Sequence, residues 1–217
     1  MAEALAIRCV CMLEIRLGHP ERVAAMAATL EKLAAQHSIV QAEGSRLLLG
    51  AWALAHLGDP ETGHARILEG HAILKRIGMI ASSTQILCYA TEAIMLAGRW
   101  SLAQAHMDEA LQLAYRLGER VRIPDLLLLQ ARIALGERRL DSARASMRAS
   151  LDEARTQHAL GFELEALVAL CELDEPEPAD LNWLEDAYGR LREGFDTALA
   201  VKARELLARH RRTSRVG

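Results

Sequence analysis

The sequence predicts an all-α fold, an α-solenoid of about five helical hairpins that repeat every forty residues and end in a C-terminal capping helix. Three observations lead to this prediction. Of the 217 residues, 51% are hydrophobic but only 4% are aromatic, and alanine and leucine, which favour helix, dominate the apolar set. Gly18, Gly58 and Gly98 stand forty residues apart. Between these glycines, apolar residues recur at steps of three and four, which is the spacing of one helix face.

The forty-residue step also generates columns of small side chains. One column holds Cys11, Ala51, Thr91, Ala131 and Cys171, and another holds Val23, Gly63, Ala103 and Ala143. Small residues at a helix crossing let the two axes approach to about 8–10 Å. A hairpin of this kind cannot bury its apolar face alone, so neighbouring hairpins must stack. We therefore expect both columns to lie between packed helices.

Each hairpin consists of a first helix and a second helix. First helices are expected at 3–17, 41–57, 81–97, 122–136 and 160–173, and second helices at 20–36, 60–77, 100–117 and 139–157. Proline suits the first turn of a helix, where its missing N–H is not needed, and Pro20, Pro60 and Pro124 occupy such positions. Gly78 and Gly118 are expected to form left-handed C-terminal caps.

The expected turns form two series with forty-residue steps, and each series includes residues other than glycine. After Gly98 the next step of forty reaches Arg138, and we interpret Gly136 as the displaced glycine of that turn. The second series consists of Ser38, Gly78, Gly118 and His158.

The C-terminal part departs from the repeat. We treat 1–217 as one domain, with repeats over 1–172, an acidic loop with two prolines over 173–180, terminal helices within 181–212 and a basic tail over 213–217. The terminal helices are expected at about 180–192 and 198–211. Gly194 is expected to cap the first of them and Phe195 to enter the core. Asp196 or Thr197 is expected to cap the last helix.

One short stretch resembles part of a nucleotide site. Gly58 and Gly63 have the spacing that opens a phosphate-binding P-loop, but His64 and Ala65 stand where that loop needs lysine and a hydroxyl residue. The preceding residues also have a helical pattern, whereas a P-loop follows a strand. We therefore interpret the stretch as a turn between two helices.

Composition and spacing argue against several other functions. A net charge of −3 gives no general attraction for nucleic acid. No run of about 18 apolar residues is present and the start lacks the order of a signal peptide, so we expect a cytoplasmic protein without membrane contact. The four cysteines match no zinc pattern, and His64 and His71 are too far apart along one helix for one metal ion. We predict no catalytic residue, cofactor or metal site, and no enzyme activity.

The predicted function is therefore a binding surface. If the first helices line a concave groove, the partner-binding candidates are Trp52, Gln85, Glu92, Asp125 and Arg132. Trp52 and Arg132 are residue types that often dominate interfaces. The alternative for Trp52 is that its ring packs between neighbouring repeats. The expected partner is a protein or peptide segment, and no oligomeric state is predicted.

The stretch from Ala97 to Leu111 resembles a tetratricopeptide repeat. It carries the order glycine, aromatic, alanine, large apolar and alanine at Gly98, Trp100, Ala103, Met107 and Ala110. The unit of forty residues is longer than the usual length of about thirty-four.

Gly118–Glu119 and the segment Glu193–Thr197 are also similar to the C-terminal helical region of large bacterial signalling proteins. These are class III adenylate cyclases that carry a P-loop ATPase, and related ATPase regulators of transcription. The resemblance implies a non-catalytic interaction and regulatory scaffold, excised from such a protein or encoded by a shortened gene, with the catalytic domains elsewhere. The alternative is a helical domain that senses a small molecule and controls attached effector domains.

Overall fold

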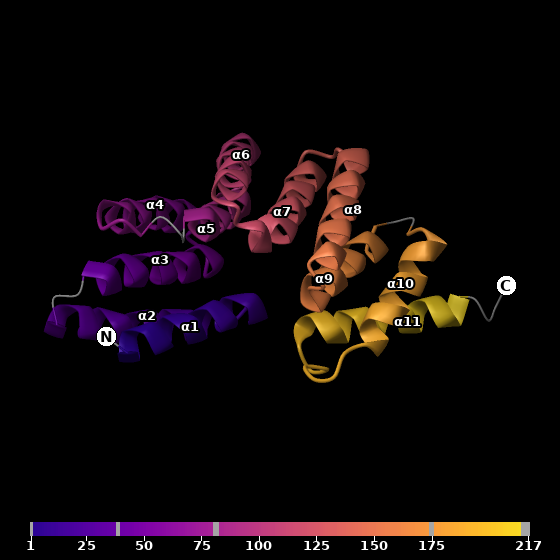
Figure 1. Ribbon diagram of the computed structural model, residues 1–217, viewed down its shortest axis with the longest axis horizontal. Helices are drawn as coiled ribbons and strands as arrows, with labels where there is room; N and C mark the ends of the chain where they lie inside the picture. The colour runs from indigo at the N-terminus through magenta and orange to yellow at the C-terminus, as the bar shows by residue number, and fades with distance from the viewer. Residues whose placement is uncertain (1, 38–39, 80–82, 174–175, 214–217) are drawn as a thin grey trace. The chain divides into compact units, whose positions relative to one another are not determined.

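A computed structural model describes residues 2–37, 40–79, 83–173 and 176–213 (Figure 1). In these ranges the chain is all-α, as the sequence predicts, with eleven α-helices, one turn of 3-10 helix and no strand. The elements are α1 (Ala2–Leu17), α2 (Pro20–His37), α3 (Val40–His56), α4 (Pro60–Arg76), α5 (Ser83–Leu96), α6 (Trp100–Leu117), η1 (Arg120–Arg122), α7 (Ile123–Gly136), α8 (Leu140–Thr156), α9 (Leu160–Cys171), α10 (Pro178–Gly189) and α11 (Ala198–Thr213). Ser38, residues 174–175 of the acidic loop and residues 214–217 of the tail lie outside the described residues.

The chain divides into two compact units, residues 1–119 and residues 120–217. In the first unit, each of the helices α1 to α5 packs against the next one along the chain, up to α6. The first helices of successive pairs also contact one another, α1 with α3 and α3 with α5. A core that includes Leu49, Ile67 and Ile86 holds these helices together.

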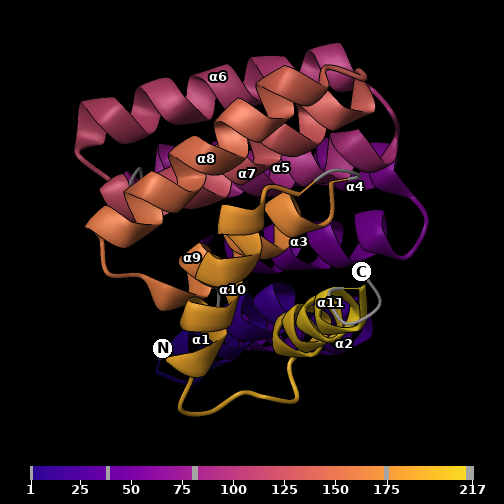
Figure 2. The same cartoon turned by 90° about the vertical axis from the view of Figure 1, so that its right-hand side faces the viewer.

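The second unit contains η1 and the helices α7 to α11. Here α7 packs on α8, α8 on α9, and α9 on α10, while α11 packs against both α9 and α10 (Figure 2). Ala203 and Leu207 bring α11 into a core that includes Leu167 and Leu184. The last helix therefore covers apolar surface of the two helices that precede it.

The small-residue columns are buried, as expected. Cys11, Ala51, Thr91, Ala131 and Cys171 are at most 5% exposed, and every member of the second column is buried as well. At Gly63 there is no room for even a methyl group, because an added Cβ would lie 2.7 Å from the Ala51 carbonyl oxygen. Gly63 thus lies inside α4 at a close crossing with α3. This placement agrees with the interpretation of the Gly58–Gly63 stretch as a turn followed by a helix.

Turns between helices adopt the left-handed conformation with and without glycine. Gly78 and Gly118 have φ of 77° and 68°, as predicted for their caps. Arg138 has φ of 60° and His158 has φ of 53°. The interpretation of Gly136 as a displaced turn glycine is wrong, because Gly136 ends α7 and Arg138 itself takes the left-handed position.

Two expectations for the C-terminal part are also wrong. Gly194 does not cap α10, which ends at Gly189 with Arg190 as its cap; the positive φ of Gly194 serves the loop before α11 instead. Phe195 is 44% exposed and lies edge-on to Tyr188, so it does not enter the core. Thr197 does cap the last helix, since its Oγ1 accepts a hydrogen bond from the Ala200 N–H at 3.3 Å.

Candidate functional site

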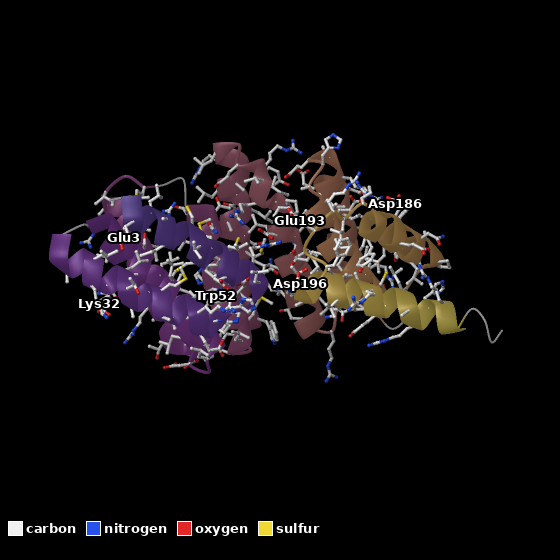
Figure 3. All side chains as sticks on the ribbon, turned by 90° about the horizontal axis from the view of Figure 1, so that it is seen from below. Glu3, Lys32, Trp52, Asp186, Glu193 and Asp196 are labelled. Carbon is white, nitrogen blue, oxygen red and sulfur yellow. The ribbon has the colours of Figure 1, made fainter. Side chains whose placement is uncertain are left out.

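Trp52 belongs to α3 of the first unit (Figure 3). The side chain is 2% exposed. Its Nε1–H donates a hydrogen bond to Glu92 Oε2 at 2.9 Å, and its ring centroid is 4.1 Å from that of His56. Of the two alternatives for this residue, packing between helices is therefore the one observed. A buried ring cannot serve as a surface anchor together with Arg132.

Glu92 is held in place by this packing. Besides accepting the indole hydrogen bond, its carboxylate lies 4.0 Å from His56 Nε2. The side chains of Glu92 and His56 are 27% and 29% exposed, so part of the carboxylate reaches the surface. Trp52 and Glu92 belong to the same forty-residue column. Their forty-residue spacing is thus the feature of the sequence that could have predicted this pair.

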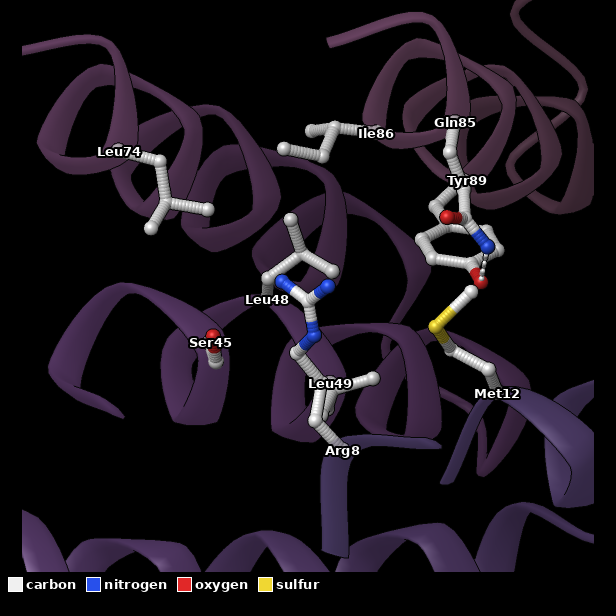
Figure 4. A pocket seen from close by; sticks show the side chains of 9 residues that line it. All are labelled: Arg8, Met12, Ser45, Leu48, Leu49, Leu74, Gln85, Ile86 and Tyr89. Atoms are coloured by element: carbon white, nitrogen blue, oxygen red, sulfur yellow. Dashed lines mark hydrogen bonds between the residues drawn. The ribbon is translucent and has the colours of Figure 1, made fainter. Parts of the chain in front are cut away.

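Gln85 contributes to a pocket in the first unit (Figure 4). Its Nε2 donates a hydrogen bond to the Tyr89 hydroxyl at 2.6 Å. The walls are mainly apolar, and the lining residues are Arg8, Met12, Ser45, Leu48, Leu49, Leu74, Gln85, Ile86 and Tyr89. Arg8 and Tyr89 were not singled out from the sequence, because a repeat column identifies equivalent positions and not the hollow that side chains from several helices form together.

Asp125 and Arg132 belong to the second unit, where each forms an ion pair. Asp125 Oδ2 lies 2.9 Å from Arg122 Nη1, and Arg132 Nη2 lies 3.4 Å from Glu165 Oε1. Asp125 is in the first turn of α7, where a negative charge also interacts favourably with the helix dipole. The Arg122–Asp125 pair is local, whereas the Arg132–Glu165 pair joins α7 to α9. The Arg132 side chain is half exposed.

Three histidines occupy partly or fully buried positions between helices. His64 Nε2 on α4 and His106 Nε2 on α6 are 2.8 Å apart, and burial lowers the pKa of both imidazoles. His71 contacts the Ser83 hydroxyl at 2.9 Å, and burial lowers its pKa as well. In the described part of the chain, no three histidine, cysteine or acidic side chains are grouped so that they could hold a metal ion.

Arginines neutralise the buried acids of the second unit. Asp180 is fully buried and pairs with Arg148. Glu163 is 5% exposed and accepts from Arg155 and Arg190, at 3.1 Å and 2.7 Å. These carboxylates are engaged by cations of the same unit, so we assign them a role in stability.

Comparison with known proteins identifies one distant relative. No family model matches the chain. Over 155 residues it is 28% identical to an uncharacterized protein of Rhizobium meliloti (strain 1021). The match covers 70% of this chain but only 15% of the relative. None of the helices in the described residues combines the length and the hydrophobicity required to cross a membrane.

Proposed function

We propose that the chain is a non-catalytic interaction and regulatory module built as a tetratricopeptide-like α-solenoid with a period of forty residues. The observation that carries the proposal is the spacing of the left-handed turn residues. They form two series with forty-residue steps, Gly18, Gly58, Gly98 and Arg138 in one and Gly78, Gly118 and His158 in the other. A turn that keeps its backbone conformation when glycine is replaced by arginine or histidine is maintained by the surrounding helices, as expected for a structural repeat.

The packing supports the same proposal. The two columns of small residues are buried, and in the first unit α1, α3 and α5 contact one another in succession. Stacked helix pairs present a face of first helices, which repeat proteins commonly use to bind a partner. In the first unit, our candidates for contacts with a protein segment are Gln85 and Glu92 on α5. In the second unit, taken by itself, the candidates are Asp125 and Arg132 on α7. Trp52 is buried behind Glu92 and fixes the position of its carboxylate through the indole hydrogen bond.

We place the module in a cytoplasmic bacterial signalling protein, of the ATPase-linked adenylate cyclase or transcriptional regulator type. Two observations support this context. The sequence resembles the C-terminal helical region of such proteins at Gly118–Glu119 and Glu193–Thr197. The distant relative is much longer than the matched segment, which makes up 15% of its length, as expected for one module within a large protein.

Affinity capture with matched variants tests the interaction face. The bait is the chain itself, as wild type, as Gln85→Ala with Glu92→Gln, and as the control Arg66→Ala on the exposed surface of α4. Glu92→Gln retains an oxygen that can accept the Trp52 hydrogen bond. We expect a partner that binds wild type and the Arg66 variant but is lost from the Gln85/Glu92 variant. Equal capture by all three baits, or capture by none, would contradict the proposed face.

A second candidate function is the sensing of a small molecule. The pocket in the first unit favours it, because apolar walls surround a few polar groups, the usual composition of a ligand site. A thermal-shift screen of metabolites tests this function, and a screen with no stabilising compound would exclude it.

A further inference from the structure

Helix α1 has an exposed apolar face on the side that points away from the core. Leu5, Val10 and Leu13 are 53%, 43% and 57% exposed, and Cys9 is exposed as well. These four residues, which we call the α1 face, lie on one side of the helix because they are connected by steps of three and four. The other side of α1 carries Ile15 into the core. Apolar residues that gather on one exposed face, rather than being scattered singly, mark an interaction surface.

Forty residues further along the chain, the same four positions are covered. Ser45, Leu49 and Ala53 of α3 are at most 5% exposed, and Gly50 is partly buried. Helix α2, the second helix of the preceding hairpin, packs along α3. A Cβ added at Gly50 would lie 3.5 Å from Ala27 Cβ of α2. The preceding second helix therefore contacts this face of α3.

The next step of forty residues leads to the same arrangement on α5. There Tyr89, Ala90 and Ala93 are at most 7% exposed, and Gln85 is partly buried. Helix α4, which is again the second helix of the preceding hairpin, packs against α5. Among the first helices of the first unit, this face is thus covered in α3 and α5 and exposed in α1.

We infer that the α1 face is the docking surface for a further helical hairpin of the same forty-residue class. The second helix of that hairpin packs on α1 as α2 packs on α3 and as α4 packs on α5. Ala27, Ile67 and Met107 lie forty residues apart on α2, α4 and α6, and all three are buried. The docking helix is therefore amphipathic and presents an apolar residue at this position.

This inference rests on the proposed function, because it assigns the docking hairpin to the larger protein in which the chain would be one module. The relative has room for many such hairpins, since the matched segment makes up 15% of its length. The α1 face continues a series of contacts that already exists between consecutive hairpins of the first unit. A neighbour of the same class extends this series by one step.

A fusion that supplies a hairpin tests the inference. A second copy of residues 41–80 is placed directly before Met1, so that residue 1 follows residue 80 as residue 81 does and the forty-residue spacing is kept. The copied segment contains no cysteine, so Cys9 reports on the α1 face. Leu13 stands where α5 has Ala93, but Cys9 stands where α5 has Tyr89. The two faces are therefore similar in total side-chain size.

We expect iodoacetamide at pH 8 to label Cys9 at least about tenfold more slowly in the fusion than in the chain alone, because a covered thiol reacts only when its surroundings open. The control fusion carries Leu13→Lys in α1. The added charge is tolerated where residue 13 is exposed, but it opposes burial of the α1 face. Cys9 of the control should react at the rate of the chain alone. Equal labelling of Cys9 in the unsubstituted fusion and in the chain alone would overturn the inference.

Sedimentation velocity of the chain alone distinguishes a hairpin from a second copy of this chain. We expect a monomer in which Cys9 reacts rapidly. A dimer that protects Cys9, and that Leu13→Lys converts to a monomer, would assign the α1 face to a second copy and overturn the inference. The capture experiment with the Gln85/Glu92 variant concerns a different surface. Loss of the captured partner and loss of Cys9 protection can therefore be told apart.

Discussion

Replacing Gly63 by alanine would introduce one methyl group into the crossing of α3 and α4. The added Cβ would lie 2.7 Å from the Ala51 carbonyl oxygen, 2.7 Å from Ala55 Cβ and 2.9 Å from the Ala55 amide nitrogen. Two of these atoms are backbone, so no side-chain rotation can relieve the contact and α4 must move away from α3. Overpacking of this kind costs about 1–3 kcal/mol. The better helix propensity of alanine returns up to about 1 kcal/mol.

With a return of about 1 kcal/mol set against the cost, the expected net result for Gly63→Ala is a loss of up to about 2 kcal/mol in the free energy of unfolding. Urea denaturation followed by circular dichroism measures it. Gly50→Ala in α3 is the matched control, because its Cβ would meet only Ala27 Cβ, at an ordinary 3.5 Å. The control should be stabilised by up to about 1 kcal/mol. Gly63→Ala should therefore be about 1–3 kcal/mol less stable than Gly50→Ala. If the two variants are equally stable, the close crossing is refuted.

Three further predictions concern buried groups. Asp180→Asn should lower the free energy of unfolding by about 2 kcal/mol in urea titrations, because the fully buried side chain loses its charge-assisted contact with Arg148, which keeps its second partner Glu177; an unchanged midpoint would contradict this. Burial lowers the pKa of His64 and His106, so the unfolded chain binds protons at a higher pH than the folded one. The free energy of unfolding should therefore fall as pH drops from about 6.5 through the pKa of the folded state. The fall should be smaller in the variant that carries both His64→Gln and His106→Gln. Burial raises the pKa of Cys11 to about 11, so iodoacetamide at pH 8 should label exposed Cys9 first in the folded chain. Equal labelling of both cysteines would refute the burial.

The helices could be predicted from the sequence because their signals are local. Helix α6 begins and ends at residues 100 and 117, as the periodicity and the turn residue Gly118 indicate. The C-terminal part was less predictable, since Phe195 and Gly194 lie in a loop outside the repeat. Phe195 has no equivalent position in the expected repeat, so the sequence gives no indication of whether its ring is buried or exposed.

The candidate site could be predicted only in part. Trp52 and Glu92 are forty residues apart, in one column of the expected repeat, and contact each other. The column pattern therefore indicates the pair but not its burial. His64 and His106 are 42 residues apart, which is outside the register of any column. The pocket around Arg8 depends on the directions of side chains from four helices, and a single sequence does not contain that information.

The turn at Arg138 tests the forty-residue repeat most directly. Arg138 is exposed, and its φ of 60° is unfavourable for any residue with a Cβ. If this turn is equivalent to those at Gly58 and Gly98, glycine fits it better than arginine. The measurement is the free energy of unfolding of Arg138→Gly in urea. We predict an increase of about 1 kcal/mol over wild type. A decrease would mean that residue 138 does not occupy the left-handed position, and would contradict the repeat.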